Sequence, residues 1–245
     1  SEQISQALAF MEACGISSKN VPNLRETSIY TSHEALLLPY EQALTRVDST
    51  SGDIYDCSAH LLWIGERTRG LDEAHAHFLS GVKNPLGVKI GASAKADEIK
   101  ALANVLNPDN EAGRLNIIIR MGADKIGSFL PQIFKELKKE GLNLIYSIDP
   151  MHGNTTKAGN FKTREFGKIM DEVRAFFEIA HAEGVYAGGV HLEMTGQDVT
   201  ECVGGSVTQE SLQNRYETQC DPRLNADQAL ELAFLIADFV KKARQ

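Results

Sequence analysis

Short apolar runs alternate with longer amphipathic stretches along most of the chain. Most of these runs are continuous and rich in Ile, Val and Leu, which is typical of strands buried on both faces of a parallel sheet. The stretches that follow them carry apolar residues at helical spacing. A helix is expected at Glu2–Ala13. Six strand–helix pairs follow, with strands expected at residues 27–32, 59–64, 85–91, 114–120, 142–149 and 188–194.

Strands that alternate with helices predict βα units, in either an open doubly wound sheet or a (β/α)8 barrel. An open sheet often carries a glycine-rich phosphate loop, but neither GxGxxG nor GxxxxGKS occurs in the sequence. Polar residues recur instead where the strands end, as at Lys89, Arg120, His152 and Glu193. In a (β/α)8 barrel, site residues come from the C-terminal ends of several strands. The pattern therefore favours an α/β fold of the (β/α)8 TIM barrel type.

The number of units limits how much of such a barrel the chain can hold. Eight units usually need about 250 residues, whereas six units take up all 245 residues here. We therefore expect residues 1–245 to form one catalytic domain, a partial (β/α)8 barrel with two strands missing. Because two sheet edges would be left unpaired, we expect a homo-oligomer or a missing segment that completes the barrel.

Composition narrows the function classes. The net charge of −8 argues against nucleic acid as a partner, since nucleic acid is bound by basic surfaces. No apolar run reaches the roughly 18 residues of a membrane span. The cysteines lack CxxC spacing, which favours a reducing, cytoplasmic setting. Of these, Cys202 and Cys220 are expected to be buried thiols.

One group of polar residues at the strand ends is cationic. Arg67, Lys89 and Arg120 follow or close three successive strands, and Glu66 and Arg69 lie beside the first of them. Arginine matches carboxylate and phosphate oxygens with two parallel hydrogen bonds, and lysine adds a compact charge. Three cations at equivalent positions indicate an anionic ligand, although each one alone is equally well explained by pairing with a nearby acid.

The second group is His152, Glu193 and Asp221, because one imidazole and two carboxylates suit Mn²⁺, Co²⁺, Fe²⁺ or Zn²⁺. No short metal motif links these residues, so the prediction depends on a fold that brings strand ends together. Taken alone, His152 is better explained as a satisfied polar residue. His33 is a further candidate, whereas His191 is expected inside a strand.

Seven motifs resemble the class II, or plant-type, 3-deoxy-D-arabino-heptulosonate 7-phosphate (DAHP) synthases. They cover nearly the whole chain in the family's order: TSHEALLLPYEQALTR, WIGERTRGLDEAHAHF, NPLGVKIG, RMGADK, DPMHGNT, GGVHLEMTGQDVTEC and CDPRLNADQALELAFLIA. The resemblance implies a (β/α)8 barrel that condenses phosphoenolpyruvate with erythrose 4-phosphate, releasing phosphate. This reaction is the first step of the shikimate pathway, which leads to aromatic amino acids.

The resemblance also implies roles for the two groups. Phosphoenolpyruvate would be held by Glu66, Arg67, Lys89 and Arg120, and a divalent metal, foremost Mn²⁺, by His152, Glu193 and Asp221. The family's first two strands, which carry a cysteine metal ligand and a KPRS-type segment, have no counterpart here. The implied location is the cytoplasm, or the plastid if the source is a plant.

Two other interpretations of the residues stay open. The same groups would serve a different metal-dependent aldolase or lyase on a barrel. Alternatively, the chain is a truncated, non-catalytic protein that binds phosphoenolpyruvate or another anion without turnover.

Overall fold

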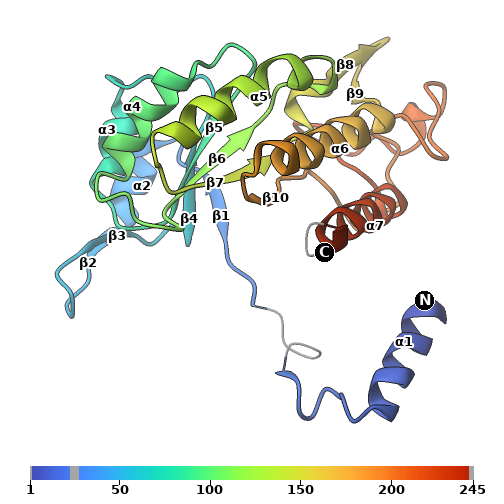
Figure 1. Cartoon of the computed structure of the whole chain (residues 1–245). Coiled ribbons are helices and arrows are strands. Elements are labelled where there is room, and N and C mark those ends of the chain that lie inside the picture. The colour runs from blue at the N-terminus through green and yellow to red at the C-terminus, as the bar shows by residue number, and fades with distance from the viewer. Residues whose placement is uncertain (1, 23–27, 243–245) are drawn as a thin grey trace. The chain divides into compact units, whose positions relative to one another are not determined.

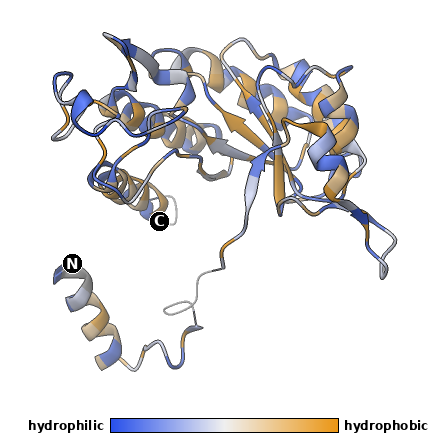
Figure 2. Cartoon of the chain, turned by 180° about the vertical axis from the view of Figure 1, so that it is seen from behind, coloured by the Kyte–Doolittle hydropathy of each residue, from blue (hydrophilic) through white to orange (hydrophobic). Residues whose placement is uncertain are grey.

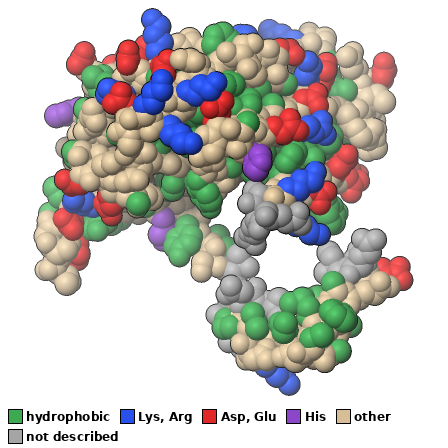
Figure 3. Space-filling model, in the orientation of Figure 1, with side chains coloured by type: hydrophobic (Ala, Val, Ile, Leu, Met, Phe, Trp, Pro, Cys, Tyr) green, Lys and Arg blue, Asp and Glu red, His purple; other side chains and the backbone are tan. Residues whose placement is uncertain are grey.

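The computed structural model describes residues 2–22 and 28–242, and it divides the chain into two units. The first unit, Ser1–Thr31, contains the helix α1 at Glu2–Ala13, which confirms the helix expected there. It exposes apolar side chains, among them Leu8 and Phe10, and Figure 3 shows apolar side chains gathered on this unit. The second unit, Ser32–Gln245, carries all the candidate site residues.

The second unit is built on a six-stranded parallel sheet (Figure 1). Its strands pair in their order along the chain: β1 (Ser32–Glu34), β4 (Leu61–Ile64), β5 (Leu86–Ile90), β6 (Leu115–Ile119), β7 (Leu144–Ile148) and β10 (Ala187–Val190). A doubly wound sheet would reverse its strand order at a switch point, and this sheet does not. The topology is consistent with part of a TIM barrel. Among the described residues, β1 and β10 each pair with one neighbouring strand of this sheet, so closure into a barrel is not seen.

Helices follow the strands and cover the sheet. They are α2 (Leu38–Leu44), α3 (Ala74–Ser80), α4 (Ala96–Leu106), α5 (Ala123–Lys139), α6 (Phe166–Glu183) and α7 (Ala226–Lys242). Figure 1 shows α3, α4, α5 and α6 side by side along one face, as right-handed connections between neighbouring parallel strands require. Figure 2 shows the apolar strands beneath them, and β5 is buried at all five positions. None of the helices in the described residues is long and apolar enough to cross a membrane.

Two antiparallel hairpins were not expected from the sequence. One pairs β2 (Thr45–Val47) with β3 (Ile54–Asp56), and the other pairs β8 (Thr155–Ala158) with β9 (Phe161–Arg164). The second hairpin has a two-residue Gly-Asn loop, in which Gly159 has a φ of 58°. Such a loop is a hairpin signal, and it stands outside the pattern of buried parallel strands. This hairpin matters for function because it brings two basic residues to the candidate site.

Two expectations were wrong. The first strand does not lie at 27–32: Ile29 and Tyr30 are exposed without regular structure, and β1 begins at Ser32. Residue 27 lies outside the described residues. Cys220 is exposed because it lies in a surface loop, whereas Cys202 is buried as expected, and burial raises the pKa of its thiol to about 12.

A glycine contact holds together the two loops that follow β6 and β7. A Cβ on Gly122 would lie 2.8 Å from the carbonyl oxygen of Gly153, and a Cβ on Gly153 would lie 2.4 Å from the backbone nitrogen of Gly122. Gly122 also has a φ of 88°, which side-chain-bearing residues rarely adopt. The backbones of the two loops therefore touch directly, with no room for a side chain.

Gly122→Ala is expected to destabilise the fold by about 1–3 kcal/mol, because it combines positive φ with a backbone clash. Gly127→Ala is the matched control, since it lies in α5 with open space around it, and it should be neutral or stabilising by up to about 1 kcal/mol. Thermal unfolding of both variants measures the difference. Equal melting temperatures would contradict a backbone-to-backbone contact.

Candidate metal and anion site

The candidate residues lie just beyond the C-terminal ends of neighbouring strands. Arg120 directly follows β6, Asp149 directly follows β7, and Glu193 lies three residues beyond β10. Since these strands are parallel, their C-terminal ends share one edge of the sheet, where α/β proteins bind ligands. Asp221 lies in the loop before α7 and reaches the same place.

Asp149 is fully buried and connects the two groups of residues. Its Oδ2 accepts a hydrogen bond from Lys89 Nζ at 2.9 Å and lies 2.7 Å from His152 Nδ1. Its Oδ1 accepts the backbone N–H groups of Met151 and His152 at 3.0 and 3.2 Å. One carboxylate therefore fixes both the lysine and the turn that carries the histidine.

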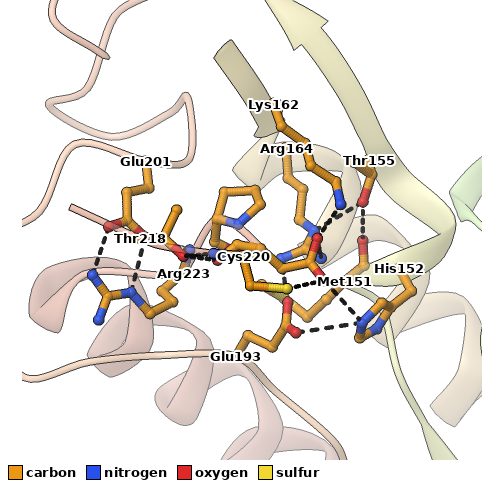
Figure 4. Close-up of polar contacts among 12 residues, drawn as sticks. Met151, His152, Thr155, Lys162, Arg164, Glu193, Glu201, Thr218, Cys220 and Arg223 are labelled. Carbon is orange, nitrogen blue, oxygen red and sulfur yellow. Dashed lines mark hydrogen bonds and ion pairs between the residues drawn. The ribbon is translucent and has the colours of Figure 1, made fainter. Parts of the chain in front are cut away.

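The three expected metal ligands converge on one point. Glu193 Oε1 lies 3.3 Å from His152 Nε2, and Asp221 Oδ2 lies 3.8 Å from the same nitrogen. One ligand atom from each residue lies within 4.8 Å of the others. Figure 4 shows Glu193 and His152 pointing toward each other from separate segments. The fold thus brings together the three residues that the sequence analysis suggested as metal ligands.

Arg164, at the end of β9, contacts the carboxylates of Glu193 and Asp221 through the oxygens that do not face His152. Its side chain is fully buried, and Nη1 donates to Glu193 Oε2 at 2.5 Å, while Nη2 lies 3.9 Å from Asp221 Oδ1. Lys162, on the same hairpin, pairs with Asp221 Oδ1. Each carboxylate thus uses one oxygen for a cation of the hairpin and turns the other toward His152.

A second buried acid orders the loop that carries Asp221. Glu201 accepts Arg223 Nε at 3.0 Å and Arg223 Nη2 at 2.6 Å, a bidentate pair that Figure 4 shows. It also accepts the backbone N–H of Arg223 at 2.8 Å. Thr218 Oγ1 donates to the carbonyl of Asp221 at 2.7 Å. These bonds hold the loop backbone on both sides of the candidate ligand.

The electrostatics keep the acids ionised. Burial alone would raise the pKa of Asp149, but His152 and Lys89 lower it well below its usual range. Glu193 and Asp221 likewise have lowered pKa values, because His152 and Arg164 outweigh burial for the first and Lys162 does so for the second. Burial lowers the pKa of His152, but hydrogen bonds to Asp149 and Glu193 raise it more, so the net pKa is raised.

The four residues expected to hold an anion are not equally placed. Lys89 is buried, with Nζ 5.4 Å from the ring centroid of Trp63, and Arg120 Nη2 donates to the carbonyl of His152 at 3.4 Å. Glu66 is half-buried, and burial raises its pKa despite the nearby Arg69 and Arg120. Arg67 is exposed and makes no hydrogen bond or ion pair among the described residues. The role of these four residues stays a prediction.

Sequence reasoning missed several residues around the site, among them Asp149, Arg164 and His191. Asp149 closes an apolar run in the sequence, and the hairpin that carries Arg164 was not expected. His191, expected inside a strand, lies one residue past β10, with its ring 4.8 Å from that of Trp63. The missed signal was an ionisable residue at a strand end, the same signal that identified Glu193.

The donor set fits a divalent transition metal. Asp149 accepts a hydrogen bond from Nδ1, which leaves Nε2 of a neutral His152 as a free electron pair facing two carboxylate oxygens. A carboxylate that orients a metal-binding histidine in this way is a common feature of metal sites. Nitrogen and oxygen ligands together suit Mn²⁺, Fe²⁺, Co²⁺ or Zn²⁺.

The fold and the site define an α/β protein with a candidate metal site at the C-terminal ends of parallel strands. Comparison with known proteins agrees: the chain belongs to the class-II DAHP synthetase family, which it matches over residues 1–237.

Three relatives illustrate the match. The chain is 49% identical over 242 residues to the phospho-2-dehydro-3-deoxyheptonate aldolase of Streptomyces coelicolor, covering 98% of this chain and 53% of the relative. It is 50% identical over 243 residues to the probable chloroplastic phospho-2-dehydro-3-deoxyheptonate aldolase of Catharanthus roseus, covering 98% and 47%. It is 46% identical over 247 residues to the phospho-2-dehydro-3-deoxyheptonate aldolase AroG of Mycolicibacterium smegmatis, covering 98% and 53%. The chain therefore spans about half the length of the curated relatives it matches.

Metal affinity is expected to depend on pH through His152. Because the imidazole must be neutral to bind a metal, Mn²⁺ affinity should fall about tenfold per pH unit below a midpoint that lies above the usual histidine value. Asp149→Asn removes the largest contribution that raises this pKa, so the midpoint should move down. It should also weaken metal binding by about 10–100-fold at high pH.

Calorimetric titration with Mn²⁺ in buffers of different ionisation enthalpy counts the protons released. His181→Asn, an exposed histidine on α6, is the control and should change neither quantity. Mn²⁺ affinity that stays constant between pH 6 and 8 would contradict binding at His152.

Proposed function

We propose that the chain is the C-terminal, catalytic part of a metal-dependent DAHP synthase. The reaction condenses phosphoenolpyruvate with erythrose 4-phosphate and releases phosphate. The observation that carries the proposal is the convergence of His152 Nε2 with free oxygens of Glu193 and Asp221, next to Lys89 and Arg120. The family match and the names of the relatives support the same reaction.

His152, Glu193 and Asp221 would hold the metal, with Mn²⁺ as the proposed ion. A bound divalent ion would supply Lewis-acid polarisation of an aldehyde oxygen. Arg164 and Lys162 hold the outer carboxylate oxygens and so balance the negative charge of the two acids. Lys162 is half-exposed, whereas Arg164 is fully buried, so the lysine is the more easily displaced of the two.

Lys89 and Arg120 would hold the carboxylate and phosphate of phosphoenolpyruvate, with Glu66 and Arg67 beside them. Lys89 is suited to this role because Asp149 and the ring of Trp63 fix its ammonium group in a buried position. A fixed cation lowers the entropic cost of bringing C3 of the enol phosphate to the aldehyde carbon. Bond formation between these carbons, followed by addition of water at C2 and loss of phosphate, gives the product.

A further stretch of polypeptide is proposed to complete the barrel, either on the same chain or on another. Among the described residues, β1 and β10 each leave one edge unpaired by the main sheet. Beside β10 lies a groove of about 650 Å³, lined by residues of α6, β10, α7 and the loop before β10 that include Phe177, Tyr186, Ile236 and Phe239. Unpaired edges and exposed apolar grooves are seldom left uncovered in native proteins. The relatives have roughly as much chain again outside the matched part.

A second candidate function is anion binding without turnover. Lys89 and Arg120 both lie on this chain, which supports an anion site that works without the remaining half of the relatives. A different metal-dependent aldolase would use the same groups with another aldehyde. The cellular location, cytoplasm or plastid, stays a prediction, and the name chloroplastic applies to the Catharanthus roseus relative.

We expect the purified chain to consume phosphoenolpyruvate slowly or not at all with erythrose 4-phosphate and Mn²⁺. Addition of the N-terminal half of the Streptomyces coelicolor relative should increase the rate at least tenfold, because it supplies the partner for the open edges. Loss of phosphoenolpyruvate absorbance measures the rate, and other aldehydes and enol phosphates test the substrate class.

His152→Ala in the completed protein should abolish turnover, and His77→Ala, at an exposed histidine on α3, is the matched control. Phosphoenolpyruvate that binds but is never consumed, even in the completed protein, would favour the anion-binding alternative. Turnover that survives His152→Ala would exclude the proposed site.

A further inference from the structure

Glu172 is a buried acid outside the candidate metal and anion site. It lies on α6 and is fully buried. Its Oε1 accepts the backbone N–H groups of Met121 and Gly122 at 3.1 and 2.8 Å, and its Oε2 accepts Asn154 Nδ2 at 2.6 Å. Burial raises its pKa to about 7, although these hydrogen bonds act in the opposite direction.

The carboxylate caps a helix that has no cap of its own. Helix α5 begins at Ala123, and its N-cap, Gly122, has no side chain to accept the free N–H groups. Glu172, on another helix, accepts the N–H of this N-cap residue and that of Met121 before it, and it places negative charge at the positive end of α5. Its position is therefore fixed by backbone donors that lead directly into the start of α5.

The groups that Glu172 binds adjoin both halves of the site. Met121 and Gly122 directly follow Arg120, the proposed anion ligand, and Asn154 lies two residues after His152, the proposed metal ligand. Asn154 also accepts the backbone N–H of Ala123 at 3.0 Å. The loops after β6 and β7 are thus tied by a single carboxylate and the amide that it holds.

The loops after β6 and β7 also contact each other directly. The backbones of Gly122 and Gly153 meet without room for a side chain, and Arg120 Nη2 donates to the carbonyl of His152. A shift of either loop would therefore move the other. A buried acid adds little stability by itself, because an apolar residue of similar volume often stabilises a fold as well. The presence of Glu172 at this position therefore favours a role in setting the geometry of the two loops.

We propose that Glu172 is a positioning residue that couples the anion-binding loop to the metal-binding loop. The inference rests on the proposed function, which identifies the two bound species as Mn²⁺ and phosphoenolpyruvate. Glu172 touches neither ligand, and it sets the relative position of Arg120 and His152 through the two loops.

Glu172→Gln tests this coupling in the completed protein. The new amide keeps one oxygen for the backbone donors, but its NH2 group faces the NH2 group of Asn154, which cannot flip without losing its bonds to Ala123 and Pro150. We expect the affinities for Mn²⁺ and for phosphoenolpyruvate, measured separately by calorimetry, each to fall at least about tenfold.

Val173→Ala is the matched control, since it removes buried volume from the same helix at a side chain that cannot hydrogen-bond to either loop. It should lower the melting temperature and leave both affinities unchanged. Loss of only one affinity in Glu172→Gln, or equal losses in Val173→Ala, would overturn the coupling.

Hydrogen exchange gives a result that needs no ligand, so failure of the proposed function and failure of the coupling are distinguishable. Glu172→Gln should speed amide exchange in peptides over 120–124 and 150–155 together, whereas Val173→Ala should not speed it selectively in these two peptides. Faster exchange in only one of these peptides, or in neither, would overturn the proposal.

Discussion

The site depends first on the buried carboxylate of Asp149. A charge with no exposure to water is tolerated only when it is paired and hydrogen-bonded, and Asp149 meets this condition with Lys89, His152 and two backbone N–H groups. The bonds that satisfy the carboxylate also fix the side chains of Lys89 and His152 in place. The proposed anion and metal ligands are therefore placed by one constraint, which spans 60 residues of sequence.

The same principle recurs around the site. Glu172 and Glu201 are buried acids whose oxygens are occupied by loop N–H groups and side chains, and Arg164 is a buried cation between two carboxylates. Strands bring the loops to one edge of the sheet, and these buried charges then set each loop. Loops positioned in this way can carry chemistry while the apolar sheet and helices provide most of the stability.

The fold was predictable where burial leaves a clear pattern. The strands β5, β6 and β7 lie inside the expected runs because both of their faces are covered, whereas the exposed Ile29 and Tyr30 gave a false strand and the short hairpins gave no parallel-strand signal. The proposed metal ligands were found because charged residues at strand ends are conspicuous and resemble a family motif. Asp149 and Arg164 were missed, since their importance comes from partners distant in sequence.

The central claim is that buried charges preset a metal site made of His152, Glu193 and Asp221. The most direct test is anomalous diffraction at the manganese edge from crystals of the protein grown with Mn²⁺. The account predicts one strong peak among these three side chains, with Asp149 still bonded to Nδ1 of His152 and Arg164 still paired with Glu193. A peak elsewhere, or a histidine turned away from Asp149 to reach the metal, would contradict it.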